Sequence, residues 1–456
     1  MAKEKSLIQD MTQGSVTKLL LVFSFPLMLS NLLQTLYNMV DMIVIGQFVG
    51  KVGLSAVSIG GELLHLLTFL VMGLSSAGQV ILSQYIGAGD RGKVKSAVGT
   101  MFTLIFFCAV LMGVVFLIFL DPILGLINTP EEAFAETRIY SLVCICGIIF
   151  IYGYNLVSAI LRGMGDSRHP FIFIAVASVV NLVLDLLFVA GLGMGAAGAA
   201  LATVIGQAVS FVWAMIYLII HREAFGFDFK PRSFIPDRLV LGKLLALGLP
   251  MALQSAALSI SMLFVNALIN TYGVVATAVT GIGNKLTSVI YVITGALSTA
   301  SATMIGQNLG AEKYDRVPKV LGVSLVIDMT CAIILSLAVV IFPRQLFGIF
   351  NSDADVLEMA MTYIPVAVLL FVGAGIRSPF FGLINGSGNA KLNLAVALLD
   401  GVICRIGLAV LMGLVMGMGI MGFWLGNAFA GYVPFFIGLV YMLSGSWKRR
   451  KVVQSS

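Results

Sequence analysis

The chain has 456 residues, of which 59% are hydrophobic and only 11% carry a charge. Soluble domains carry about 25% charged residues, so this composition cannot cover a water-exposed surface. The net charge is +6, but the basic residues lie in short loops between apolar segments, which does not indicate nucleic-acid binding. The composition therefore predicts an integral membrane protein.

Apolar segments long enough to cross a bilayer recur along the whole chain. A spanning helix needs about 20 residues, and backbone groups cannot stay unpaired in lipid, so these segments must be helices. The polar stretch before the first segment, and the length of that segment, argue against a cleavable signal peptide. The expected fold class is an all-α membrane protein with twelve spans, at residues 17–45, 52–82, 95–120, 137–161, 170–190, 195–220, 240–270, 274–305, 317–342, 357–384, 392–414 and 418–444.

Basic residues predict the topology. They concentrate in loops that follow even-numbered spans and at both ends of the chain, whereas the alternate loops are mostly acidic. Because cytoplasmic loops carry the excess of Lys and Arg, we expect both termini in the cytoplasm. The most polar internal segment, 221–239, joins two apolar halves. We therefore expect an amino-terminal six-helix lobe over 1–222, a cytoplasmic linker over 223–239 and a carboxyl-terminal six-helix lobe over 240–456.

The two halves resemble each other at a nearly constant spacing. Gln84 and Gln307, for example, are 223 residues apart (307 − 84 = 223). Six helices per half give both halves the same orientation, as in the parallel repeats of other transporters. The corresponding segments are LSQYIGAGD (82–90) with IGQNLGAEK (305–313), LRGMGDSRHP (161–170) with LINGSGNAKL (383–392), GMGAAGAALAT (193–203) with GMGIMGFWLGN (417–427), and Pro26 with Pro250.

Several of these motifs together resemble the MATE (multidrug and toxic compound extrusion) family, and its bacterial DinF-like branch in particular. The resemblance runs from about Lys18 to Tyr441. It is carried by PLMLSNLLQTLYNMVDMIVIGQFVG (26–50), AVSIG (56–60), SQYIGAG (83–89), RGMGDSRHP (162–170) and their second-half counterparts.

The resemblance implies two pseudo-symmetric six-helix bundles in the bacterial cytoplasmic membrane. It implies export of amphipathic, often cationic, organic compounds in exchange for H⁺ or Na⁺ by alternating access. The expected partners are drugs or toxic organic cations, H⁺ or Na⁺, and membrane lipid. We expect no cofactor, no nucleic acid and a monomer.

The first span carries a polar stripe on an otherwise apolar helix. Asn31, Gln34, Asn38 and Asp41 fall within an arc of about 80° at about 100° per residue. Hydrogen bonds between helices are an equally good explanation for Asn31 and Gln34. A carboxylate in the bilayer costs about 3 kcal/mol or more, so Asp41 is a functional candidate.

Asp185 and Asn181 lie one turn apart on one face of the fifth span. Two carboxylates that converge in a low-dielectric site repel each other, and a proton or Na⁺ would relieve the repulsion. The family resemblance implies a cation-coupling site made of Asp41, Asp185 and Asn181, with Tyr140 and Thr203. Any metal would be Na⁺ at Asp41 and Asp185.

The second half does not repeat this chemistry, because Asp41 and Asp185 correspond to Val265 and Ala409. It has buried charges of its own, which we expect to pair with one another or to line an aqueous cleft: Lys285, Asp328, Arg377, Asp400 and Arg405. A substrate cavity between the halves is expected to involve Asn31, Gln34, Tyr37, Asn38, Gln254, Met262 and Arg377.

Other functions are less consistent with the motifs. No GxxxxGK[ST] motif is present, so the energy for export would come from an ion gradient. An intramembrane enzyme would need a nucleophile with a base or a metal triad such as HExxH, and the sequence has neither, so we expect no enzymatic activity. A lipid-linked oligosaccharide flippase of the same superfamily is the nearest alternative, since Lys285, Arg377 and Arg405 would suit an anionic headgroup.

Overall fold

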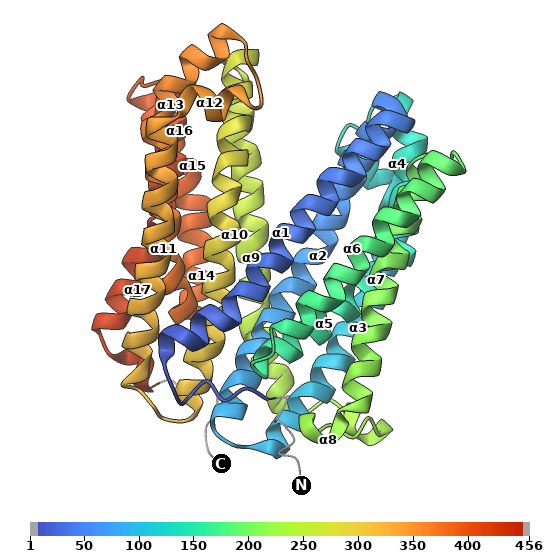
Figure 1. Ribbon diagram of the computed structural model, residues 1–456, viewed down its shortest axis with the longest axis vertical. Coiled ribbons are helices and arrows are strands. Elements are labelled where there is room, and N and C mark those ends of the chain that lie inside the picture. Colours follow the sequence, from blue (N-terminus) through green and yellow to red (C-terminus); the bar gives the residue numbers. More distant parts are fainter. Residues whose placement is uncertain (1–7, 450–456) are drawn as a thin grey trace. The chain divides into compact units, whose positions relative to one another are not determined.

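The computed structural model describes residues 8–449, which are almost entirely helical and contain no strand. Lys3, Lys5, Arg450 and Lys451, which contribute to the topology argument, lie outside the described residues. Figure 1 shows the helices that make up the spans, some of which are interrupted. Their bounds are α1 Val16–Phe48, α2 Gly50–Gly87, α3 Arg91–Leu126, α4 Glu131–Cys146, α5 Ile148–Gly163, α6 Arg168–Asp185, α7 Gly195–Ile220, α9 Arg238–Asn270, α10 Val274–Gly310, α11 Arg316–Ile341, α13 Ala354–Gly386, α14 Ala390–Leu398, α15 Arg405–Val410, α16 Ile420–Ala430 and α17 Val433–Leu443.

The predicted spans are confirmed. Among the described residues, eleven helices are long and apolar enough to cross a membrane, and the bent pair α4 and α5 makes a twelfth span. The chain is therefore a multi-pass membrane protein. Most helices extend a few residues beyond the predicted bounds, because helical hydrogen bonding continues past the apolar segment.

Two predicted spans are less regular than expected. The 137–161 span is broken at Gly147, where α4 and α5 meet at 50°. A Cβ at Gly147 would lie 2.4 Å from Val204 of α7, so the break sits where another helix approaches closely. The 392–414 span contains two π-helical segments, η3 (Leu399–Cys404) and η4 (Leu411–Val415).

The chain forms two compact units, each with a core of its own. Among the described residues, unit 1 contains 8–10 and Leu29–Gly248, and unit 2 contains Met11–Met28 and 249–449. Helices α1 and α9 therefore each contribute to both units. The lobes expected at 1–222 and 240–456 place the span of α1 in the first lobe and that of α9 in the second, whereas each unit contains part of both helices. The lobe boundaries stay a prediction.

Equivalent packing contacts recur in the two halves. A Cβ at Gly60 of α2 would lie 2.3 Å from the Tyr140 ring of α4. In unit 2, a Cβ at Gly283 of α10 would lie 2.3 Å from the Tyr363 ring of α13, and both members are 223 residues further along the chain. Each glycine thus makes room for a buried tyrosine, and the internal repeat extends to individual side-chain contacts.

The segment before α1 is held in unit 2 by the second-half motif IGQNLGAEK. The Met11 backbone N–H donates to Oε1 of Gln307 at 2.8 Å, and Nδ2 of Asn308 donates to the Met11 carbonyl at 3.2 Å. Nζ of Lys313 donates to the Thr12 carbonyl at 2.9 Å. The motif therefore fixes the residues that lead into α1.

The polar segment between α7 and α9 folds onto α3 in unit 1. Hydrogen bonds from the Lys95 ammonium and the Ser233 hydroxyl hold the pKa of the Asp228 carboxyl below its ordinary value. This segment contains α8 (Arg222–Phe225) and η2 (Pro231–Phe234), and its Phe225 and Phe227 are buried. The expected linker is thus a docked element, because its phenylalanines need apolar partners.

Close helix packing predicts the cost of a single methyl group. A Cβ at Gly386 of α13 would lie 2.6 Å from the Ala302 carbonyl oxygen of α10, and backbone cannot move aside as a side chain can. We expect Gly386→Ala to destabilise the protein by about 1–3 kcal/mol. Fluorescence-detected thermal unfolding of the purified protein measures this.

The matched control is Gly281→Ala in α10, where nothing lies within 4 Å of an added Cβ. It should leave the unfolding temperature unchanged or raise it, since alanine favours helix by about 1 kcal/mol over glycine. Equal unfolding temperatures for the two variants would contradict the packing in unit 2.

Candidate functional site

Asp41, Asn181 and Asp185 come together inside unit 1. Asp41 lies on α1, and Asn181 and Asp185 lie one turn apart on α6. All three are buried, with Asp185 only 1% exposed. Asp185 is the last residue of α6, where the π-helical segment η1 (Leu186–Gly191) begins. Such π segments are frequent at functional sites, because they turn the side chains on either side relative to each other.

Asn181 connects Asp41 to α7. With the amide oriented to satisfy both of its ends, Nδ2 donates to Oδ1 of Asp41 at 3.0 Å, and Oδ1 accepts from the Thr203 backbone N–H at 3.3 Å. A charged acceptor makes the stronger kind of hydrogen bond. The amide therefore links α1, α6 and α7 through polar groups that lipid could not satisfy.

Asp185 has no donor for its carboxylate. Neither Oδ1 nor Oδ2 has a hydrogen-bond partner among the described residues, and both oxygens are buried. The carboxyl groups of Asp185 and Asp41 nevertheless lie in side-chain hydrogen-bonding contact. Two carboxylates are acceptors only, so this contact needs a proton between them or a cation beside them.

Two tyrosines surround the acid pair. Tyr140 is buried on α4 and interacts electrostatically with Asp41, and Tyr37 of α1 interacts with both Asp41 and Asp185. The coupling set expected from the sequence is therefore buried in one unit. The sequence predicts Tyr37 as a residue of the substrate cavity rather than of the coupling site, and the cavity role stays a prediction. Its position one turn before Asp41 on the same helical face is the signal that places it near the acids.

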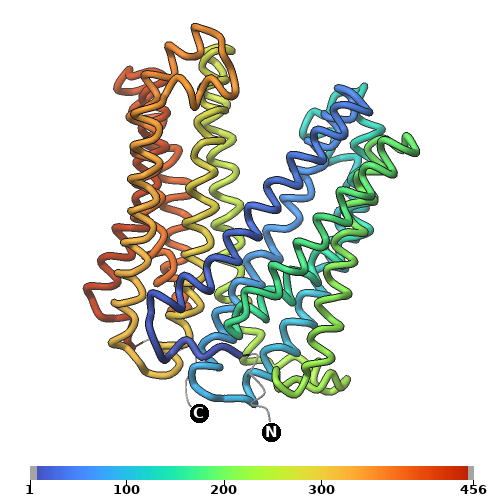
Figure 2. Tube along the Cα trace, in the orientation of Figure 1, coloured from blue at the N-terminus to red at the C-terminus, as the bar shows by residue number. Residues whose placement is uncertain are grey.

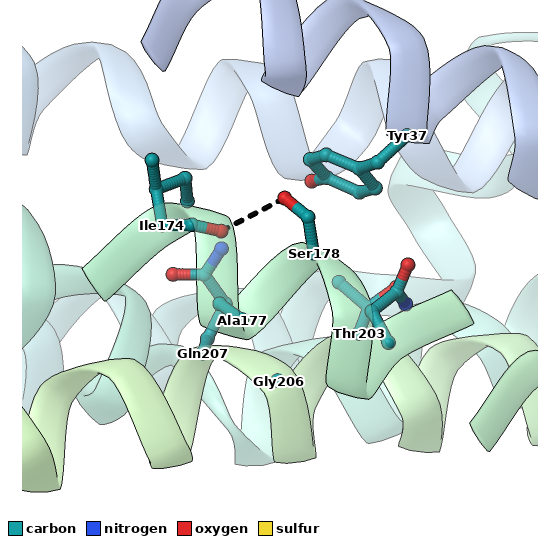
Figure 3. Close-up of a pocket in the computed structure, with 8 residues that line it drawn as sticks. Tyr37, Ile174, Ala177, Ser178, Thr203, Gly206 and Gln207 are labelled. Atoms are coloured by element: carbon teal, nitrogen blue, oxygen red, sulfur yellow. Dashed lines mark hydrogen bonds between the residues drawn. The ribbon is translucent and has the colours of Figure 1, made fainter. Parts of the chain in front are cut away.

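A small recess lies beside Asn181, between α1, α6 and α7. Figure 3 shows Tyr37 from one side, with Ser178, Thr203 and Gln207 from α6 and α7, and the Ser178 hydroxyl directed at the Ile174 carbonyl. The space in the recess that a water-sized molecule can occupy is about 10 Å³, which is roughly what one water needs and far too little for a drug. Its size suits water or an ion.

The other residues expected in the substrate cavity divide between the units. In unit 1, Asn31 is partly buried, and Gln34 and Asn38 are exposed on α1. In unit 2, Gln254 is buried, and Met262 and Arg377 are partly buried. Their common role in one cavity stays a prediction.

Unit 2 holds three of its buried charges in one cluster. Nη2 of Arg405 donates to Oδ1 of Asp400 at 2.7 Å, and Nη1 of Arg377 lies 3.7 Å from Oδ2. Nη1 of Arg405 also donates to the side chain of Asn427. The expected pairing is confirmed for these charges. Lys285 was expected to be buried, but it is exposed and lies over the Phe350 ring.

The π-helical segment η3 makes the strongest of these ion pairs feasible. Asp400 and Arg405 are five residues apart, which places them about 140° apart around a regular α-helix. The wider π turn brings residues five apart onto one face. Sequence periodicity alone does not find this pair, because it assumes α-helical spacing.

The five cysteines are free, and all lie in helices, as the sequence indicated. Cys146 is exposed and the other four are buried or partly buried. Among the described residues, no three His, Cys, Asp or Glu side chains form a metal-binding group.

The ion cluster predicts unequal costs for its two arginines. Removing Arg405 leaves a fully buried Asp400 with a single partner at 3.7 Å, and such a loss typically costs about 3–5 kcal/mol. We expect Arg405→Ala to lower the unfolding temperature and the yield more than Arg377→Ala. Neither guanidinium can ligand a cation, so any folded fraction should keep its ion dependence. An Arg405→Ala variant as stable as the parent would contradict this.

Comparisons with known proteins support one family. The MatE family model matches the chain twice, at residues 26–187 and 250–411, and the two starts are 224 residues apart, as the sequence repeat predicted. The probable multidrug resistance protein YpnP of Bacillus subtilis is 28% identical over 97% of this chain and 98% of the relative. The probable multidrug resistance protein NorM of Thermotoga maritima is 25% identical over 96% and 94%.

The fold also resembles that of solved transporter structures. A solved outward-facing structure of a multidrug resistance MATE transporter of the MOP superfamily superposes with a TM-score of 0.90 at 22% identity, over 99% of this chain and 100% of that one. With both family matches together covering more than half of its length, the chain belongs to the MATE family, whose members are transporters and not enzymes.

Proposed function

We propose that this protein is a secondary active multidrug exporter that exchanges amphipathic, often cationic, organic compounds for H⁺ or Na⁺ by alternating access. The observation that carries the ion coupling is the buried contact between Asp41 and Asp185, neither of which has a salt-bridge partner among residues 8–449. The names of the relatives support drugs as substrates. The sequence contains no nucleotide-binding motif, so the gradient of the coupling ion would supply the energy.

The coupling follows from the electrostatics of the pair. With the site empty, two carboxylates in contact repel each other in a medium of low dielectric constant. A proton or Na⁺ removes the repulsion, and Asn181, Tyr140 and Thr203 supply neutral polar groups around it. The neutralised site then lets α1 repack, with a hinge near Pro26, where the helix lacks one backbone hydrogen bond.

Repacking of α1 alters the substrate cavity, so drug and ion compete through one conformational equilibrium. Such coupling is reciprocal: the ion weakens drug binding by the same factor as the drug weakens ion binding. Both H⁺ and Na⁺ fit the proposal. Ethidium efflux from proteoliposomes under separately imposed H⁺ and Na⁺ gradients distinguishes them.

The acid pair can be tested by removing one charge at a time. Asp41→Asn and Asp185→Asn should each abolish ion-driven ethidium efflux, because an amide keeps the volume but does not change charge. The protein should remain inserted, since the amide costs less to bury. Glu132→Gln is the control, because Glu132 is an exposed acid in the first turn of α4 in the same unit.

Wild-type efflux in both Asp41→Asn and Asp185→Asn would disprove the site. Glu62 and Asp400 would then be the next acids to test. Loss of efflux in the Glu132→Gln control as well would show that the assay responds to any lost carboxylate.

We further propose a bacterial cytoplasmic membrane location with both termini and the 223–239 linker in the cytoplasm, a monomeric state, and lobes that divide at this linker. Ser233 lies in the linker but bonds Asp228, so the exposed Ile235 is the better reporter. In a Cys146→Ser background, Ile235→Cys should react with a membrane-impermeant maleimide only after the cells are opened. Labelling of intact cells would reverse the proposed orientation.

The flippase alternative rests on Arg377 and Arg405, and both already contact Asp400. Only Lys285 is left of the three cations that favoured an anionic headgroup. Binding of ethidium in preference to a lipid pyrophosphate is therefore expected, and the opposite preference would favour the flippase.

A further inference from the structure

Unit 2 contains two fully buried acids in different surroundings. Asp400 has two arginines beside it. Asp328 lies in the middle of α11, is 0% exposed, and has no salt-bridge partner among the described residues. Its Oδ1 also has no hydrogen-bond partner in that part of the chain. A carboxylate at this depth in a membrane helix needs compensation, and the two acids cannot obtain it in the same way.

Serine hydroxyls are the polar groups around Asp328. Oγ of Ser301 donates to Oγ of Ser324 at 3.1 Å, and Oγ of Ser324 donates to Oδ2 of Asp328 at 3.4 Å. Ser301 lies on α10, and Ser324 is one turn before Asp328 on α11. Figure 2 shows that α10, α11 and α13 run side by side, so the acid is enclosed by three helices of one unit.

Ser378 of α13 indicates the protonation state that fits. Its side chain interacts with the Asp328 carboxyl, but its hydroxyl hydrogen is directed at the Thr294 carbonyl at 2.8 Å. A hydroxyl has one hydrogen to donate, so the Ser378 oxygen is left to accept. A carboxylic acid satisfies that arrangement by donating, whereas a carboxylate has nothing to donate.

The charged and titratable groups nearby offer no compensation. On α11 itself, Cys331 interacts with Asp328 but is not cationic. On α13, Arg377 contacts Asp400. On α10, Lys285 lies over the Phe350 ring. These groups therefore leave the charge of an Asp328 carboxylate unbalanced. A proton on the carboxyl or a cation bound beside it would remove that charge.

We propose that Asp328 is a protonation site of unit 2, with its carboxyl held by the Ser301–Ser324 hydroxyl chain. Hard metal ions in proteins gather about six or more oxygen ligands, and one carboxyl with weakly placed serines does not supply them. The ligand is therefore a proton. The site is independent of the Asp41–Asp185 pair and does not rest on the exchange mechanism proposed for it.

Infrared difference spectroscopy tests the site directly on the full-length protein in lipid. The C=O stretching band of protonated carboxyl groups is recorded at neutral and at alkaline pH, where ordinary exposed carboxyl groups are ionised and give no band. The parent for the measurement is Asp41→Asn/Asp185→Asn, which removes the other acid pair. We expect the band to remain in this parent and to be lost when Asp328→Asn is added. Size-exclusion elution confirms that the variants are folded.

Ser324→Ala is the second variant and keeps Asp328. It removes the donor that favours the charged carboxylate, so the band should persist to a higher pH than in the parent. Addition of Na⁺ at fixed pH should leave the band unchanged. A band that survives Asp328→Asn, an unshifted band in Ser324→Ala, or a band removed by Na⁺ would each overturn the proposal. None of these outcomes depends on whether Asp41 and Asp185 couple transport.

Discussion

The constraint on which the structure depends is that lipid offers no partner to a buried charge. Each unit meets this constraint with its own side chains. In unit 2, Asp400 lies between two arginines, which compensate its charge within the unit. In unit 1, Asp185 is just as buried, but neither of its oxygens has a donor in the described part of the chain. The first arrangement compensates its charge with the protein's own side chains, whereas the second does not, and the proposed coupling ion would supply what is missing.

The repeat has kept its packing and changed its chemistry. The contact of Gly60 with Tyr140 and that of Gly283 with Tyr363 are equivalent, because helix separation is set by backbone and ring volume. Polar residues are under no such constraint once the helices are in place. Asp185 corresponds to Ala409 in the second half, so the first half has an acid pair that the second half lacks.

The sequence predicts the spans well, because each needs a long apolar segment and polar breaks between segments. It also places Asp41, Asn181 and Asp185 on helical faces, from which their proximity was a reasonable expectation. It does not predict the bend at Gly147 or the π turn that joins Asp400 to Arg405. Both depend on contacts with distant helices, and a periodicity of 3.6 residues carries no information about them. For the same reason, the periodicity does not predict which residues of other helices contact Asp328.

Helix α1 offers a route by which the ion proposed at Asp41 would act beyond its own site. The helix belongs to unit 2 as far as Met28 and to unit 1 from Leu29 onward. The residues before it are fastened to Gln307 and Lys313 by hydrogen bonds, so the start of the helix cannot follow freely when its later part moves. In the proposed mechanism, strain from a change at Asp41 would therefore concentrate in the part of α1 between its fixed start and Asp41. Pro26 lies there, where one backbone hydrogen bond is missing and bending costs least.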